Sequence, residues 1–154
     1  MEPFLALLQW AGFILLFVAS LRWGKGPERI CAGVYVGLIL SEVVYHLLLG
    51  GETRHDRTDP FHFAVNFVAW ATLLKVALEA NRIYPIWLCV FQTISVLSHA
   101  VRNILSDDFT VAYWLMVTGP TKFVIVTLAI GLALHCRRVR RIGSYRSWRA
   151  SSNR

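Results

Sequence analysis

The chain has 154 residues, of which 56% are hydrophobic and only 16% are charged, and its formal net charge is +7 at pH 7. Water-soluble domains carry charge on about a quarter of their residues, so this chain lacks the charge that a water-facing surface needs. Its three cysteines are also too few for a disulfide-stabilised scaffold. The composition therefore excludes a disordered chain and a disulfide scaffold, and it favours a protein surrounded by lipid.

Five apolar runs are long enough to cross a bilayer as helices, because a hydrocarbon core of about 30 Å needs roughly 20 residues. None of them alternates as a membrane β-strand does. In chain order the runs cover residues 4–23, 30–49, 61–80, 86–105 and 111–135. The sequence predicts an all-α polytopic membrane protein, with a bundle of five transmembrane helices over residues 1–135 and an arginine-rich cytoplasmic tail over residues 136–154.

Prolines mark the expected beginnings of four helices, because proline suits the first turn, where its missing N–H would have no partner. Each of these runs is preceded by one proline: Pro3, Pro27, Pro60 or Pro85. Pro120 differs, since it lies beside Gly119 inside the fifth run and removes a backbone donor there. We expect Pro120 to kink this helix near Met116 or to divide it into two pieces.

Lysine and arginine set the expected orientation, because cytoplasmic connections retain them. The residues before the first run include none, whereas the first connection carries Arg22, Lys25 and Arg29. Seven of the sixteen basic residues follow the fifth run. We therefore expect a protein of the cell inner membrane with its N-terminus outside and its C-terminus in the cytoplasm.

The arginine-rich tail has a second expected role at the membrane surface. It contains no acidic residue, and each arginine near an anionic leaflet contributes about 1 kcal/mol of attraction. We expect anionic headgroups or a membrane-protein partner to contact four residues: Arg137, Arg138, Arg140 and Arg141. No nucleic-acid-binding motif surrounds them, so nucleic acid is not an expected partner.

Two further features lie in the inner half of the predicted bundle. Gly33 and Gly37 form a GxxxG pattern, which lets membrane helices approach closely. It predicts a packing contact for the second helix, with self-association as the alternative. Lys75, Glu79 and Arg82 lie near the inner end of the third run, where we expect them to be solvated.

Ionisable side chains gather in the outer half of the predicted bundle. Such groups are costly at membrane depth and usually face a bundle interior or a cavity. Glu42 and His46 share one face of the second helix, because they are four residues apart. Other runs bring five more polar residues to a similar depth: His62, Asn66, His99, Arg102 and Lys122. We expect Glu42 to contact His46, His99, Arg102 or Lys122.

Several chemistries would suit this layer. Glu42, His46, His62 and His99 offer the carboxylate and imidazole groups that bind zinc or another divalent ion, and we expect them to form one cluster. Two histidines on different helices would instead suit a haem, and the ionisable groups together would suit a proton path. The purely structural alternative is a set of interhelical hydrogen bonds, worth about 0.6 to 2 kcal/mol each.

The function expected from the sequence is that of a non-enzymatic accessory or assembly component of a larger membrane complex. The chain shows no nucleotide motif and no internal repeat of the transporter kind. Ser95 and His99 are one turn apart, but nothing supplies an oxyanion hole, so no catalytic residue is predicted. The alternatives are a metal- or haem-binding membrane protein, an enzyme included, and a small ion or proton transporter.

Overall fold

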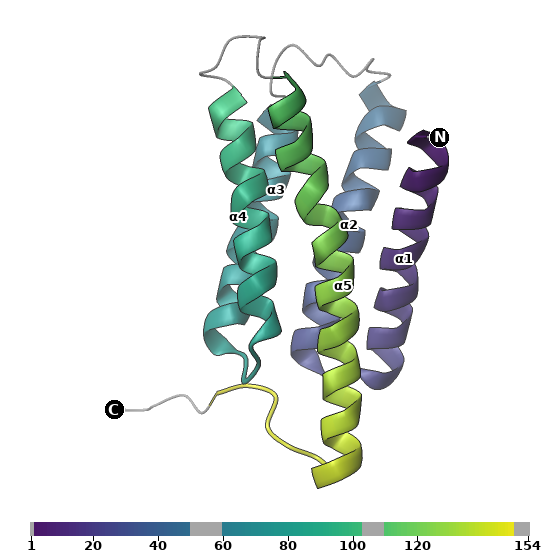
Figure 1. Ribbon diagram of the computed structural model, residues 1–154, viewed down its shortest axis with the longest axis vertical. Helices are drawn as coiled ribbons and strands as arrows, with labels where there is room; N and C mark the ends of the chain where they lie inside the picture. Colours follow the sequence, from purple (N-terminus) through teal and green to yellow (C-terminus); the bar gives the residue numbers. More distant parts are fainter. Residues whose placement is uncertain (1, 50–59, 103–109, 150–154) are drawn as a thin grey trace.

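The computed structural model describes residues 2–49, 60–102 and 110–149, and this part of the chain is almost entirely helical. Five helices run alternately up and down and lie side by side in a bundle (Figure 1). In chain order they are α1 (Glu2–Trp23), α2 (Gly26–Leu49), α3 (Pro60–Glu79), α4 (Tyr84–Arg102) and α5 (Thr110–Ile142). The predicted all-α bundle of five helices is confirmed.

Four of the described helices are long and apolar enough to cross a membrane, namely α1, α2, α3 and α5. Their outward faces carry large apolar side chains: Leu47 and Leu48 are each 78% exposed, and Leu15 is 69% exposed. Exposing such a surface to water would be unfavourable, since each Å² of apolar area in contact with water costs roughly 25 cal/mol of free energy. The exposed apolar surface therefore fits a hydrocarbon surrounding.

Helix α4 packs against α3 and α5. Its polar side chains turn inward, so that Gln92, Ser98 and His99 are 4%, 2% and 8% exposed. The Ser98 hydroxyl donates to the Ile94 carbonyl at 2.7 Å, which satisfies it within the helix. Helix α4 thus supplies polar groups to the interior of the bundle.

Helix α2 begins at Gly26 rather than at residue 30, because its first turn has a strong cap. Glu28 reaches back, and its Oε2 accepts the Lys25 backbone N–H at 3.0 Å. This is the half of a capping box in which the third helical residue satisfies the N-cap donor. Pro27 fits the same turn, since it needs no hydrogen-bond acceptor there.

Helix α5 continues to Ile142, so the predicted end at His135 is wrong. Hydrophobicity falls at this point, but arginine is a good helix former and basic side chains suit a helix C-terminus. The helix stops at Gly143, which has a φ of 73° and donates its N–H to the Val139 carbonyl at 2.9 Å. Four arginines assigned to the tail are therefore helical: Arg137, Arg138, Arg140 and Arg141.

Pro120 lies inside α5, which continues through it without interruption. The expectation that Pro120 divides the fifth run into two pieces is therefore wrong. Membrane helices tolerate an internal proline because neighbouring helices and small local adjustments satisfy the freed carbonyl group.

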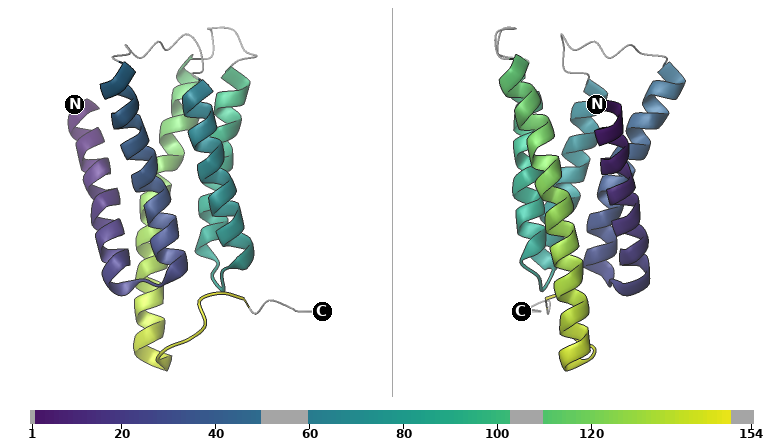
Figure 2. Two further views of the ribbon diagram at one scale, coloured as in Figure 1. Left: turned by 180° about the vertical axis from the view of Figure 1, so that it is seen from behind. Right: turned by 45° about the vertical axis from the view of Figure 1, so that its right-hand side comes forward.

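Residues 143–149, here called the returning segment, cross the C-terminal end of the bundle, where α5 stops (Figure 2). Two backbone hydrogen bonds attach the returning segment to the turn between α3 and α4. Asn81 donates its N–H to the Ser147 carbonyl at 3.0 Å, and Arg149 donates its N–H to the Glu79 carbonyl at 2.8 Å. Trp148 packs so closely on Gly26 that a Cβ atom there would lie 2.9 Å from the indole.

The apolar core lies mainly in the half of the bundle nearer the returning segment. Small side chains let α2, α3 and α4 come close there, with Cys31 and Ala80 at 0% exposure and Cys89 at 8%. Only one glycine of the GxxxG pattern in α2 lies at a helix contact. A Cβ atom at Gly33 would lie 3.4 Å from the Phe17 ring, whereas nothing lies within 4 Å of that position at Gly37. The other half of the bundle contains a cavity and a polar cluster.

Candidate metal centre

One carboxylate joins two imidazoles near the N-terminal end of the bundle, where α2 stops and α3 begins. Glu42 Oε1 lies 3.1 Å from His46 Nε2, and Glu42 Oε2 lies 3.3 Å from His62 Nδ1. The expected contact between Glu42 and His46 is present, because residues four apart share one face of a helix. His62 comes from the first turn of α3, so the group links two antiparallel helices.

Aromatic packing holds the His62 ring beside α2. Tyr45 stacks on Phe61 with ring centroids 4.5 Å apart, and the Tyr45 ring centre lies 5.1 Å from that of His62. Tyr45 precedes His46 on α2, and Phe61 precedes His62 on α3. The stacked pair therefore holds the two helices at the register that places both imidazoles against Glu42.

These three side chains have the composition of a divalent metal site. Their ligand atoms all lie within 4.8 Å of one another, and the side chains of Glu42, His46 and His62 are 45%, 30% and 25% exposed. Zinc bonds of about 2.0–2.2 Å put neighbouring ligand atoms of a tetrahedral site roughly 3.4 Å apart. The two distances from the Glu42 oxygens are close to that spacing, and the third separation, between the two imidazole nitrogens, is no more than 4.8 Å. A small approach of the rings would complete three ligand positions and leave a fourth open.

A cavity of about 310 Å³ lies beside this group. Glu42 and His62 line it together with Asn66 and His99, so four predicted site residues share one space. His99 is 8% exposed and comes from α4. Among the described side chains, however, the group of close ligand atoms consists of Glu42, His46 and His62 without His99.

The cavity wall also contains polar groups from the middle of the bundle. The Gln92 amide donates to Asn66 Oδ1 at 2.8 Å and joins α4 to α3. Tyr35 is 5% exposed, and its hydroxyl has no hydrogen-bond partner among the described residues. A buried polar group without a partner costs about 1–3 kcal/mol.

Lys122 does not belong to the cluster, although its depth along α5 suggested a contact with Glu42. Thr121 lines the cavity, whereas Lys122 is exposed. One residue turns the side-chain direction by about 100° on an α-helix, so equal depth does not ensure a common face. Arg102 ends α4, and its side chain lies outside the described part of the structure.

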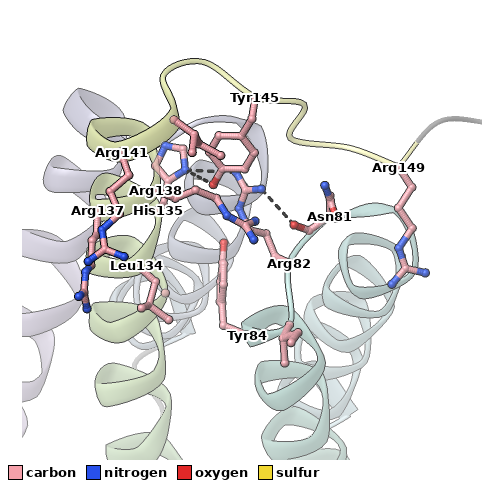
Figure 3. A pocket seen from close by; sticks show the side chains of 13 residues that line it. Asn81, Arg82, Tyr84, Leu134, His135, Arg137, Arg138, Arg141, Tyr145 and Arg149 are labelled. Carbon is pink, nitrogen blue, oxygen red and sulfur yellow. Dashed lines mark hydrogen bonds between the residues drawn. The ribbon is translucent and has the colours of Figure 1, made fainter.

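A second polar cluster, which was not predicted from the sequence, lies at the C-terminal end of the bundle. Arg82 Nε donates to Glu28 Oε1 at 2.9 Å, and the two side chains are only 6% and 2% exposed. Arg82 Nη2 also lies 3.2 Å from His135 Nδ1, which in turn lies 2.9 Å from the Tyr145 hydroxyl (Figure 3). The expectation that Arg82 is solvated is therefore wrong.

The arrangement of this second cluster depends on segments far apart in the sequence. Glu28 lies in the first turn of α2, and Arg82 lies in the turn before α4. His135 lies on α5, and Tyr145 lies in the returning segment. Because a guanidinium group only donates hydrogen bonds, its contact makes His135 Nδ1 an acceptor. One feature of the sequence could have indicated this cluster. Glu28 is an acidic residue among basic ones at a predicted inner helix end, where a buried partner is expected.

Comparisons with protein-family models, with curated proteins and with solved structures find no match to this chain.

Proposed function

We propose that this protein binds a divalent transition-metal ion, zinc above all, within a membrane-spanning helix bundle. Glu42, His46 and His62 are the ligands in this proposal. The observation that carries it is the close group of one carboxylate and two imidazoles, whose ligand atoms lie within 4.8 Å of one another. Nitrogen and oxygen donors of this kind suit zinc and other divalent ions, and three protein ligands leave one position for water or a substrate.

The same geometry favours a small ion over haem. Both imidazole nitrogens point at the two oxygens of one carboxylate, at 3.1 and 3.3 Å. Axial histidines of a haem must instead face each other across the iron and the porphyrin plane. Since Glu42 lies between the nitrogens of His46 and His62, a compact cation would replace these two contacts with less rearrangement.

The proposed location is the cell inner membrane, with the metal site toward the outside. Lys25 and Arg29 at the start of α2 lie at the same end of the bundle as the arginines of α5 and the returning segment. Positive charge of this kind is retained on the cytoplasmic side. The opposite end, with His46 and His62, then faces the extracytoplasmic side.

A second candidate role is that of an accessory component in a larger membrane assembly. Gly37 favours it, because nothing lies within 4 Å of the position of its missing Cβ although it belongs to a GxxxG pattern. Small residues on outward faces let another membrane helix approach closely. A bound metal at the extracytoplasmic end and a helix partner along α2 are compatible in one protein.

Metal analysis of the purified protein tests the first proposal. After zinc is added and excess zinc is removed, we expect inductively coupled plasma mass spectrometry to find about one zinc ion per chain. His46→Ala and His62→Ala should each weaken zinc binding by at least about a hundredfold, since loss of an outer-shell partner alone costs roughly 10–100-fold. Lys122→Gln, an exposed position at similar depth, is the matched control and should bind zinc normally.

The proposal is wrong if the folded protein retains less than about a tenth of an equivalent of zinc. It is equally wrong if the two histidine variants bind zinc as the unchanged chain does. Circular dichroism of each variant separates loss of the ligand from loss of the helices.

A further inference from the structure

A pocket of about 680 Å³ lies at the C-terminal end of the bundle, between α5, the turn before α4 and the returning segment (Figure 3). We call it the basic pocket, because five arginines line it: Arg82, Arg137, Arg138, Arg141 and Arg149. Arg137, Arg138 and Arg141 come from α5, while Arg149 lies across from them. The helix and the returning segment thus both contribute arginines to the lining of one pocket.

Most of this positive charge has no acidic partner within the described chain. Arg82 pairs with Glu28, but residues 2–49, 60–102 and 110–149 provide no carboxylate within 4.0 Å of the other four arginines. Arg138 lies over the Tyr145 ring, 5.1 Å from its centre. Four arginines that line one pocket and have no carboxylate partner among the described residues favour an anion, and arginine is the residue best suited to bind phosphate in bidentate fashion.

The basic pocket also has an apolar side. Ile83, Leu134 and Ile142 line it and are 74%, 57% and 66% exposed. A small soluble anion would neutralise the arginines and leave these side chains uncovered. An amphipathic molecule would satisfy both sides at once, because its charged group meets the arginines and its hydrocarbon covers the apolar side chains.

Several contacts hold the pocket in place before any ligand binds. Arg82 is fixed by Glu28 and His135, and its guanidinium carbon lies 4.4 Å from the centre of the Tyr145 ring. The Arg149 N–H donates to the Glu79 carbonyl at 2.8 Å, which anchors that arginine beside the end of α3. A site arranged in advance loses less entropy on binding.

We propose that the basic pocket binds the phosphate headgroup of one anionic phospholipid, with its acyl chains over Ile83, Leu134 and Ile142. The site lies at the level where the apolar helix surface gives way to arginine, which is the level of headgroups in a bilayer. It is separate from the metal centre and does not depend on it.

Native mass spectrometry tests this proposal on the full chain in detergent, with equal amounts of phosphatidylglycerol and phosphatidylcholine. We expect one phosphatidylglycerol molecule to be retained per chain in preference to phosphatidylcholine. The double variant Arg138→Gln/Arg141→Gln should weaken this binding about 25-fold, at about fivefold for each arginine. The matched control is Arg22→Gln/Arg146→Gln, which removes the same charge from exposed positions outside the pocket and should stay within about twofold.

Three outcomes would overturn the proposal. Equal loss in both double variants would mean diffuse attraction to charge and no site. Equal retention of the two lipids would mean that the headgroup charge is not recognised. Displacement of the lipid by glycerol 3-phosphate at similar concentration would assign the pocket to a soluble phosphate compound.

Discussion

Glu28 is the residue on which the C-terminal end of the bundle most depends. Its Oε1 accepts a hydrogen bond from Arg82 at 2.9 Å, and its Oε2 caps α2 through the Lys25 N–H at 3.0 Å. The same carboxylate lies 3.9 Å from His135 Nδ1. A buried ion pair stabilises little relative to apolar residues, but removal of one partner leaves the other charge buried and unpaired.

Glu28→Gln should therefore lower the free energy of unfolding by about 3–5 kcal/mol. Thermal unfolding in detergent, followed by circular dichroism, measures the change. Glu79→Gln is the control, because that side chain is exposed and only its backbone carbonyl is used. The double variant Glu28→Gln/Arg82→Leu should recover part of the loss. Equal stability of Glu28→Gln and the unchanged chain would contradict the role assigned to the pair.

Gly131 allows α5 to approach the Tyr84 ring. A Cβ atom at this position would lie 2.6 Å from the ring, which is too close for carbon atoms. We expect Gly131→Ala to destabilise the fold by about 1–3 kcal/mol through overpacking. Gly37→Ala is the opposite case, since nothing lies within 4 Å there and alanine favours a helix by about 1 kcal/mol. Unfolding curves that order the two variants the other way would refute this account.

At the scale of single residues, spacing predicted contacts within a helix better than contacts between helices. Glu42 and His46 meet as expected, because four residues make about one turn. Lys122 was assigned to the same layer from depth alone, and its rotation around α5 places it on the exposed face. Arg82 was expected in solvent, because its buried partner begins a different helix.

At the scale of elements, the returning segment differs most from what the sequence suggested. A basic run after a membrane helix is usually interpreted as a solvated tail. Here the residues up to Ile142 continue α5, and the returning segment packs against the end of the bundle. Trp148 provides the apolar contact, since it lies against Gly26 and joins the core cluster. Hydrogen bonds to Asn81 and Glu79 then fix its backbone.

Trp148→Ala should release the returning segment from the bundle. We expect faster hydrogen exchange at the Asn81 and Arg149 amides, because both donate to the backbone bridge that Trp148 supports. Trp87→Ala removes an indole that is 56% exposed on α4 and should leave both amides protected. Unchanged exchange at both amides in Trp148→Ala would show that the two hydrogen bonds hold the segment without the indole.

At the scale of the whole molecule, the described helices separate two polar sites by the length of the bundle. The Glu42 group lies where α2 stops, and the Glu28 cluster lies where α2 begins. Between them is the apolar core of small and aliphatic side chains. Such a division suits a protein that meets different solutes on the two faces of a membrane.

Cysteine labelling tests the proposed topology. In a chain with Cys136→Ser, the remaining Cys31 and Cys89 are buried and should react slowly with a membrane-impermeant maleimide. Thr53→Cys, in the connection between α2 and α3, should react in intact cells. Ser144→Cys should react only after the membrane is opened. Labelling of both positions from the same side would reject the alternating arrangement in a membrane.

The sequence by itself determined the number of helices and their approximate bounds, and it favoured a membrane surrounding. These properties depend on composition and on spacing along one helix, since a run of about 20 apolar residues is long enough to cross a bilayer wherever its neighbours lie. The contact between Glu42 and His46 could be predicted for the same reason, because both residues lie on one helix.

Only the tertiary structure decided which polar groups meet across helices. Helix rotation placed His62 against Glu42 and turned Lys122 outward, and the returning segment brought Tyr145 to His135. Arg82 became a buried partner of Glu28 because the bundle closes around both. The physical reason is that depth follows from counting residues, whereas rotation and pairing depend on how all the helices pack together.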